Sequence, residues 1–299
     1  MQIFVFMLLC IIWGTTWLAI KISLTGIPPF LGAALRFMVA SLILLIYARI
    51  TKASLKLSRS DFKNVFISAI LLYPVDYGLI YWSEQHLAAG VTAIFFATFP
   101  LFMSIFSNFV FKNETFNKWK FGGVIIGLSG VVLIFYDQLL LTNYELLVII
   151  AIIAVIVSAA AAATSTLIVK KHLNHVATAP LTLHQMLWGI IFLFIISFFM
   201  GETTDITINL QVAGAVLYLG AFGSAVAFVL YYWLLKKLSA ITLSFIIYIT
   251  PVIAIIADWL VFGETIALKT FVGMLLIFIG IALSQKGLIR RMRLVQVVD

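Results

Sequence analysis

The chain is a succession of long apolar segments separated by short polar or turn-forming clusters. An α-helix needs about 20 predominantly apolar residues to cross the hydrocarbon layer of a membrane. Ten segments have that character, which predicts an all-α polytopic membrane protein with ten transmembrane helices. The predicted spans are residues 3–23, 29–50, 63–83, 88–111, 119–136, 145–169, 178–200, 210–235, 239–262 and 267–286.

The first half of this pattern returns in weaker form about 150 positions later. Each block holds five spans, an odd number, so the second block must be inserted upside down relative to the first. We therefore expect two inverted five-helix repeats, over 1–137 and 144–286, and a basic cytoplasmic tail over 287–299. Inverted repeats that meet at the membrane midplane are typical of secondary transporters. The matched positions are Pro100 with Pro251, Glu114 with Glu264, Gly123 with Gly273, and Gly130 with Gly280.

Lysine and arginine concentrate in the even-numbered connections and after the last span, whereas the odd connections are acidic. Short loops rich in these cations stay in the cytoplasm. The even loops and both chain termini are therefore expected to be cytoplasmic. The basic positions are Arg49, Lys52, Lys56, Arg59, Lys63, Lys112, Lys118, Lys120, Lys170, Lys171, Lys236, Lys237, Arg290, Arg291 and Arg293.

Composition excludes a soluble domain, because 64% of the residues are hydrophobic and the mean hydropathy is +1.19. The net charge of +8 lies in loops that flank the membrane, where attraction to lipid headgroups explains it better than nucleic acid does. Cys10 is the only cysteine, so neither an intramolecular disulfide nor a thiolate metal site is possible. We expect no metal, no cofactor and no nucleic-acid partner, and a protein that functions as a monomer in the lipid bilayer.

Three features carry a resemblance to a known family: the Trp13-Gly14 start of the first span, the Pro-to-Glu spacing that ends spans four and nine, and the glycine-rich spans five and ten. Together they resemble the EamA-type ten-helix members of the drug/metabolite transporter superfamily, once per half over nearly all of residues 1–286. The resemblance implies a central cavity lined by spans 1–4 and 6–9, with spans 5 and 10 packed outside. It also implies transport of small metabolites, often outward across the bacterial inner membrane.

Asp76 is the sharpest candidate for transport chemistry. It lies near the middle of the third span, two residues after Pro74, and its repeat-mate is Ala227. Ionisable groups within spans are costly and usually face a cavity or a partner. Tyr73, Tyr77 and Glu84 fall near the same helix face, which gives a polar stripe towards the outer mouth. We expect the two tyrosines and Asp76 to contact the substrate and Asp76 to carry protons. The alternative is a carboxyl group that only fixes packing by a hydrogen bond to a neighbouring span.

Two tryptophans lie in the middle of the first span, although tryptophan usually belongs at the membrane interface. Trp13 and Trp17 are one helical turn apart, with Thr16 alongside. Such an aromatic wall can stack on a flat substrate or hold a cation. Aromatic bulk that faces lipid or fills the packing between helices is the competing interpretation.

The seventh and second spans carry further polar candidates. His184 and Trp188 cluster with Gln185 on one side of the seventh span, where the histidine either binds substrate or is hydrogen-bonded within the bundle. Arg36 in the second span is a possible receptor for a substrate carboxylate. It is equally able to pair with Asp258, at a similar depth in the ninth span.

Two prolines interrupt the fourth and ninth spans at mirrored places. Pro100 and Pro251 each remove a backbone hydrogen bond and bend a helix, which provides either a moving hinge or a static kink. The freed carbonyl groups can line a cavity. Thr98 beside the first proline, and Tyr248 and Thr250 beside the second, are expected lining residues.

These patterns predict a secondary transporter that exports small metabolites, such as amino acids or similar zwitterionic or planar compounds, by alternating access. The sequence contains no Walker A loop, so we expect a proton gradient or the substrate gradient to supply the energy. A membrane-embedded enzyme would need a convergent nucleophile and base, and a channel would need rings of like groups. We expect no enzyme, and a multi-pass protein of the cell inner membrane.

Overall fold

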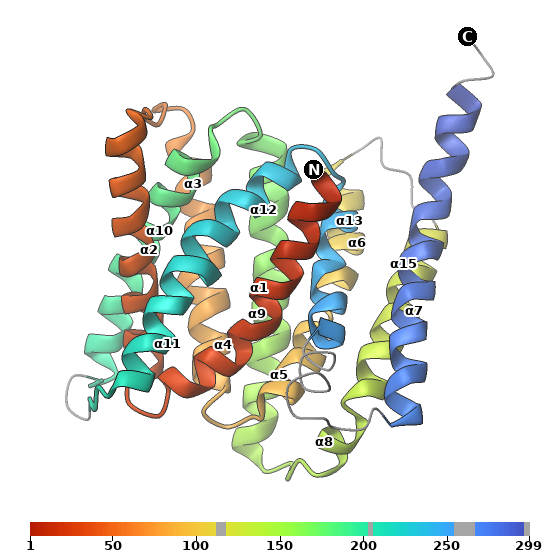
Figure 1. Ribbon diagram of the computed structural model, residues 1–299, viewed down its shortest axis with the longest axis horizontal. Helices are drawn as coiled ribbons and strands as arrows, with labels where there is room; N and C mark the ends of the chain where they lie inside the picture. The colour runs from red at the N-terminus through yellow and green to blue at the C-terminus, as the bar shows by residue number, and fades with distance from the viewer. Residues whose placement is uncertain (112–117, 203–205, 254–266, 296–299) are drawn as a thin grey trace.

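The computed structural model describes residues 1–111, 118–202, 206–253 and 267–295, with side chains as far as Ser284 in the last range. The described chain is built from helices joined by short turns, and it contains no strand (Figure 1). The predicted all-α architecture is therefore confirmed. The repeat positions Glu114 and Glu264, and the remainder of span nine at 254–262, lie outside the described residues.

The first half of the chain runs up and down through helices that alternate with tight turns. Its third span is one continuous helical run of three parts, α3, η1 and α4. The elements are α1 (Gln2–Ser23), α2 (Pro29–Thr51), α3 (Phe62–Ile70), η1 (Leu71–Tyr77), α4 (Gly78–Ser83), α5 (Ala89–Phe96), α6 (Phe99–Val110), α7 (Lys118–Ile134) and α8 (Tyr136–Leu140).

The second half repeats this order, and its eighth span is again a continuous run of three parts, α11, η2 and α12. The elements are α9 (Leu146–His172), α10 (Thr178–Phe199), α11 (Leu210–Gly220), η2 (Ala221–Val226), α12 (Ala227–Leu235), α13 (Ala240–Ser244), the helical residues 246–253, and α15 (Leu268–Val295). The predicted tail from residue 287 thus continues α15 as far as Val295.

Seven helical runs in the described ranges are long and apolar enough to cross a membrane, and they match predicted spans one to four and six to eight. Helix α7, with 17 residues, occupies predicted span five. Shorter apolar helices, 240–253 and 268–284, occupy spans nine and ten. Large apolar side chains such as Phe109, Phe199 and Leu217 remain exposed, as expected for a surface that faces lipid.

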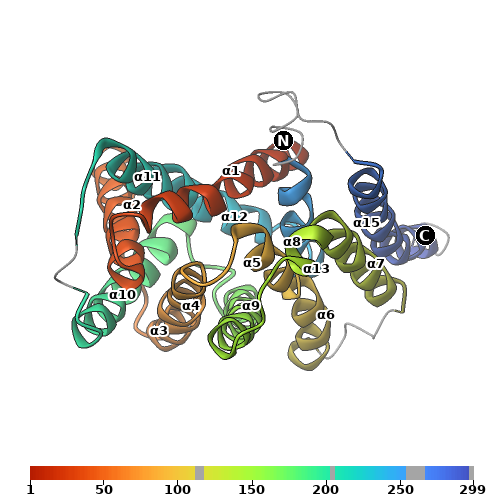
Figure 2. The same ribbon diagram turned by 90° about the horizontal axis from the view of Figure 1, so that it is seen from below.

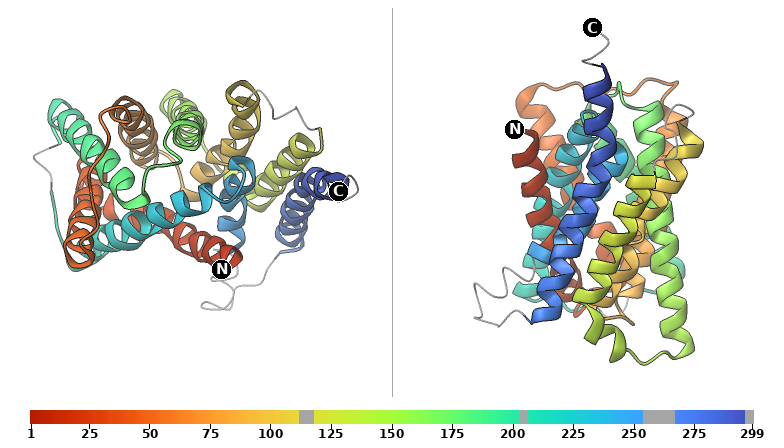
Figure 3. Two further views of the ribbon diagram at one scale, coloured as in Figure 1. Left: turned by 90° about the horizontal axis from the view of Figure 1, so that it is seen from above. Right: turned by 90° about the vertical axis from the view of Figure 1, so that its right-hand side faces the viewer.

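The helices form an elongated bundle with a packed pair at each end. Helices α2 and α10 lie at one end, and α7 and α15 lie side by side at the other, in all three figures (Figures 1–3). The start of α1 and the last described turn of α15 lie at the same edge of the bundle (Figure 3). Helices α1, α9 and α12 and the η1 segment occupy the middle, where the candidate site lies.

Glycines allow α7 and α15 to approach closely. A Cβ atom on Gly123 would lie 2.3 Å from the carbonyl oxygen of Gly280, and one on Gly130 would lie 2.6 Å from that of Gly273. Conversely, a Cβ atom on Gly280 would lie 2.4 Å from the carbonyl oxygen of Gly123, and one on Gly273 would lie 2.8 Å from that of Gly130. Backbone contact at this distance excludes any side chain, so these glycines are packing residues of the bundle.

Two π-helical segments, η1 and η2, interrupt the third and eighth spans, and the sequence pattern did not predict them. Pro74 lies inside η1, where it lacks an N–H group and its ring crowds the carbonyl group four residues earlier. A wider turn relieves that clash. Such π-turns inside α-helices occur frequently at functional sites, and η1 also carries Asp76.

The fourth and ninth spans are interrupted near the two prolines. In the fourth span the helix breaks at Ala97–Thr98, and Pro100 is the second residue of α6, where no intrahelical N–H is needed. In the ninth the break falls at Phe245, and Pro251 lies within the helical residues 246–253. The interruptions therefore precede the prolines.

Candidate functional site: a central cavity

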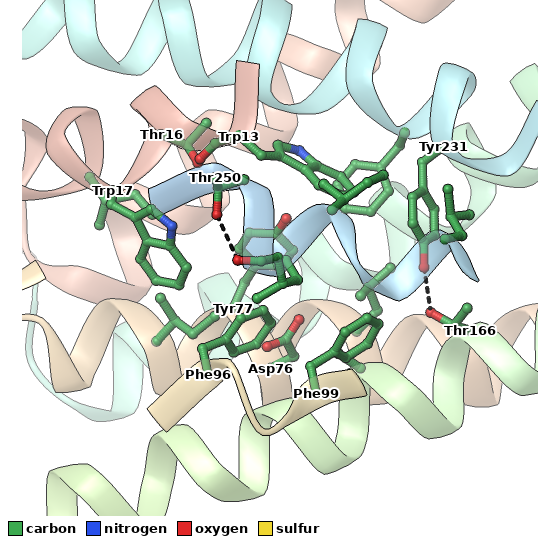
Figure 4. Close-up of a pocket in the computed structure, with 18 of the residues that line it drawn as sticks. Trp13, Thr16, Trp17, Asp76, Tyr77, Phe96, Phe99, Thr166, Tyr231 and Thr250 are labelled. Atoms are coloured by element: carbon green, nitrogen blue, oxygen red, sulfur yellow. Dashed lines mark hydrogen bonds between the residues drawn. The ribbon is translucent and has the colours of Figure 1, made fainter. Parts of the chain in front are cut away.

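A cavity of about 80 Å³ lies in the middle of the bundle (Figure 4). One water requires roughly 10–15 Å³ on this measure, so the cavity has room for several waters or the polar end of a solute. Both halves of the chain contribute side chains. The lining consists of Trp13, Thr16, Trp17, Ile20, Arg36, Leu72, Asp76, Tyr77, Ile80, Phe96, Phe99, Ala162, Thr166, Phe228, Tyr231, Tyr232, Leu243, Ile246, Ile247 and Thr250.

The two mid-span tryptophans both face this cavity rather than lipid. Trp13 Nε1 donates to the carbonyl oxygen of Gly223 at 3.3 Å, and its ring packs against Tyr231 with centroids 5.2 Å apart. Trp17 contacts the ring of Phe96 edge-on at 5.6 Å. Thr16 also lines the cavity, although its hydroxyl donates to the carbonyl of Trp13 in its own helix. The wall is therefore aromatic, and hydrogen bonds anchor the Trp13 indole and the Thr16 hydroxyl.

Asp76 and Tyr77 place polar atoms of η1 at the cavity. Asp76 lies between Phe96 and Phe99 in Figure 4, and its Oδ1 atom is buried with no hydrogen-bond partner. Tyr73 does not line the cavity. It stacks behind Tyr77, with centroids 6.3 Å apart. Of the polar residues predicted on this helix face, Asp76 and Tyr77 line the cavity, whereas Tyr73 packs against Tyr77.

Arg36 reaches the cavity from α2 and is 1% exposed. Its Nε donates to Ser224 Oγ at 2.7 Å, and its Nη2 donates to the carbonyl oxygen of Gly223 at 3.0 Å. Both acceptors belong to η2, and the guanidinium lies 4.8 Å from the centroid of the Tyr77 ring. Nη1 has no hydrogen-bond partner. Asp258, the alternative partner predicted for Arg36, lies outside the described residues.

Three predicted site residues make packing contacts away from the cavity lining. His184 Nδ1 lies 2.8 Å from the carbonyl oxygen of Pro180 in the same helix. Trp188 packs edge-on against Phe62 and Phe66. Tyr248 donates its hydroxyl to the carbonyl of Val124, at 2.9 Å. Thr250, predicted beside it, does line the cavity.

Several lining residues of the second half, above all Tyr231 and Tyr232, are not predictable from the patterns described above. Tyr232 is the repeat-mate of Tyr81, and a feature present twice is naturally interpreted as scaffold. In the structure its hydroxyl donates to Gln185 Oε1 at 2.7 Å, and Gln185 Nε2 donates to Ser68 Oγ at 2.6 Å. The signal available in the sequence was Gln185, a fully buried amide that requires partners.

Within the described ranges, no group of three or more His, Cys, Asp or Glu side chains is placed to hold a metal ion. The groups at the cavity are aromatic rings, hydroxyls and two opposite charges. This combination suits binding of a small organic solute.

The profile of the EamA-like transporter family matches residues 1–136 and, a second time, residues 149–285. This chain belongs to the EamA-like transporter family. It is similar to the uncharacterized transporter YoaV of Bacillus subtilis, with 26% identity covering 94% of this chain and 95% of YoaV. The uncharacterized inner membrane transporter YedA of Escherichia coli is 28% identical, covering 93% of this chain and 89% of YedA.

PagO of Salmonella typhimurium is 27% identical, covering 93% of this chain and 91% of that protein. A crystal structure with 16% identity superposes with a TM-score of 0.77 and covers 95% of this chain and 96% of its own; it shares the fold. Family membership and the apolar helices together establish a multi-pass membrane transporter, not an enzyme.

Proposed function

We propose that this EamA-family protein is a secondary transporter that exports small metabolites, such as amino acids or similar zwitterionic or planar compounds, by alternating access. The observation that carries the proposal is the buried central cavity, to which both copies of the family profile contribute side chains. A site between two repeats, reached from one side of the membrane at a time, is the arrangement on which alternating access depends.

Contacts that recur in both halves support two inverted repeats, over 1–137 and 144–286. The glycine contacts between α7 and α15 are reciprocal. Two lysines also make matching contacts, each from the first helix of its half to the carbonyl groups that end the third span of that half. They run from Lys21 Nζ to the carbonyl oxygens of Glu84 and Leu87, and from Lys170 Nζ to those of Leu235 and Leu238.

We infer that each lysine closes one end of the cavity, Lys21 the outer end and Lys170 the cytoplasmic end. Hydrogen bonds from a charged donor contribute about 1.5–3 kcal/mol, so their loss should favour opening on that side on the order of tenfold or more. With Thr250→Cys as reporter in a Cys10→Ser background, Lys21→Met should accelerate labelling by an impermeant maleimide in right-side-out vesicles. Lys170→Met should do so in inside-out vesicles. Acceleration by both variants from the same side would contradict this assignment.

We further propose that both termini lie in the cytoplasm and that the protein resides in the cell inner membrane. The positions of the first turn of α1 and the last described turn of α15, at one edge of the bundle (Figure 3), support this orientation. One chain supplies both sides of the cavity, which supports a functional monomer with lipid, substrate and protons as its partners and no nucleic acid.

Proton coupling is assigned to Asp76, whose carboxyl group faces the cavity from η1 with one oxygen unpartnered. A membrane potential of 100 mV supplies about 2.3 kcal/mol per charge moved, enough for roughly fiftyfold accumulation. If a proton and a solute bind alternately at this one carboxylate, the inward flux of protons is coupled to the outward flux of solute.

Counterflow in liposomes tests the function itself. Cells that overexpress the protein are challenged with amino acids, analogues and toxic metabolites, and each protective solute is then loaded into proteoliposomes. Saturable, accelerated exchange of labelled external solute against the loaded solute is expected of a carrier. Flux without accelerated exchange would indicate a channel instead, and absence of any flux would contradict transport.

A further inference from the structure

Two opposite charges face the central cavity and interact electrostatically, but they form no direct ion pair with each other. Arg36 is 1% exposed and Asp76 is 2% exposed, and both line the cavity. Among the residues that the structure describes, the ion pairs are Asp61 with His175 and Lys269 with Asp137. Each of the two cavity charges retains one buried atom with no hydrogen-bond partner, Nη1 of Arg36 and Oδ1 of Asp76.

Hydrogen bonds hold Arg36 in place, and the surroundings leave Nη1 of Arg36 and Oδ1 of Asp76 without a partner. The bonds from Arg36 to Ser224 and Gly223 fix the guanidinium plane and leave Nη1 as the free donor. The Ser158 hydroxyl donates a hydrogen bond to the carbonyl oxygen of Val155 at 2.8 Å and also interacts with Asp76, whose Oδ1 atom still has no hydrogen-bond partner. An uncompensated buried charge is strongly unfavourable, so both atoms favour a ligand of complementary charge.

Neighbouring polar groups do not remove this requirement. Lys21 is bound to backbone carbonyls. Glu84 interacts electrostatically with Arg36, but it does not line the cavity and makes no hydrogen bond to Nη1. Tyr81, whose hydroxyl is also buried and unpartnered, interacts with Arg36. It offers Nη1 only a neutral acceptor, which a carboxylate outcompetes because charge-assisted hydrogen bonds are roughly twice as strong.

We propose that Arg36 and Asp76 form a two-point clamp for a zwitterion, in which Arg36 Nη1 binds the carboxylate and Asp76 Oδ1 binds the ammonium group. This inference rests on the proposed transport through the cavity, and it names the residues that select the substrate class. A zwitterion adds no net charge to the site, whereas a singly charged analogue leaves one buried charge unpaired. Trp17, Phe96 and Phe99 receive the apolar side chain of the ligand.

The clamp is tested by binding to purified protein with three probes of similar size. L-phenylalanine carries both charges, L-phenylalaninamide only the ammonium, and 3-phenylpropionate only the carboxylate. The wild type should bind the zwitterion at least tenfold more tightly than either analogue, because a site with buried polar groups strongly rejects a ligand that leaves one unpaired. Arg36→Met should abolish the preference for phenylalanine over its amide, and Asp76→Asn the preference over phenylpropionate.

Asp61→Asn is the control, because Asp61 is a carboxylate that is 7% exposed, lies outside the cavity lining and pairs with His175 rather than with Arg36; this variant should preserve both ratios. Arg36→Lys, which keeps the charge, covers the case in which Arg36→Met does not fold; it should retain part of the carboxylate preference. Equal affinities of the wild type for all three probes, no binding of phenylalanine at millimolar concentration, or unchanged ratios in the variants would overturn the clamp. Counterflow of other solutes would persist in that case, so an experiment that rules out the clamp would not rule out the proposed transport function.

Discussion

Replacing Asp76 by asparagine should abolish the response of transport to a pH gradient while leaving a folded protein. The amide has nearly the same shape, so the lining of the cavity is kept (Figure 4), but it cannot take up or release a proton. In proteoliposomes the wild type should accumulate solute when a proton gradient is imposed. The variant should show only gradient-independent counterflow, and only at higher solute concentration because the ammonium contact is weakened.

Glu84→Gln separates this effect from the general loss of a buried carboxylate. Glu84 directly follows the same span, is fully buried, and has no hydrogen-bond partner at either carboxylate oxygen. Since it does not line the cavity, its variant should keep proton-driven accumulation. Coupling that survives in Asp76→Asn, with the same dependence on pH, would show that the proton travels by another route.

The second large effect is expected at the contact between α7 and α15. In Gly123→Ala the new Cβ atom would lie 2.3 Å from the carbonyl oxygen of Gly280 and 2.8 Å from the amide nitrogen of Ser284. Backbone atoms cannot turn aside as a flexible side chain can, so the two helices must separate. Overpacking of this kind costs about 1–3 kcal/mol or more. The thermal unfolding midpoint of the purified protein in detergent should fall by several degrees.

The neighbouring residue provides the control for this substitution. A Cβ atom on Gly122 meets nothing within 4 Å, so Gly122→Ala should leave the unfolding midpoint unchanged or slightly raised, because alanine has less freedom to lose on folding. Gly280→Ala, whose Cβ would lie 2.4 Å from the carbonyl oxygen of Gly123, should reproduce the loss from the opposite helix. Equal midpoints for Gly122→Ala and Gly123→Ala would exclude close contact as the cause.

Hydropathy predicted the helical class and the positions of most spans, because the bilayer imposes the same constraint on every crossing segment: about 20 apolar residues with all backbone groups paired internally. The free-energy cost of placing certain side chains in the hydrocarbon layer predicted part of the site as well. A charge in mid-span is unfavourable in lipid, so Asp76 was identifiable as a residue that faces the interior. Trp13 and Trp17 were candidates because tryptophan usually lies at the membrane interface, although contact with lipid or packing between helices was an equal alternative. The structure places all three at one cavity.

Side chains that are stable both in a cavity lining and in the packing between helices could not be assigned in this way. Tyr248 and Trp188 can line a cavity or fill a gap between helices, and the structure uses both for packing. Tyr232 looked like shared scaffold, yet it lines the cavity. The direction of a tyrosine depends on which helix lies beside it, and this is a property of the assembled bundle.

The sequence by itself determined that this chain crosses a membrane as helices, that its halves are related, and that one carboxylate distinguishes them. Only the tertiary structure decided which side chains share the cavity. The π-turns of η1 and η2 rotate the residues that follow them, and η2 supplies the acceptors that orient Arg36. Helical periodicity assumes regular turns and contains no information about neighbouring helices. The binding site, in contrast, forms where several helices pack together, and two of these helices contain irregular turns.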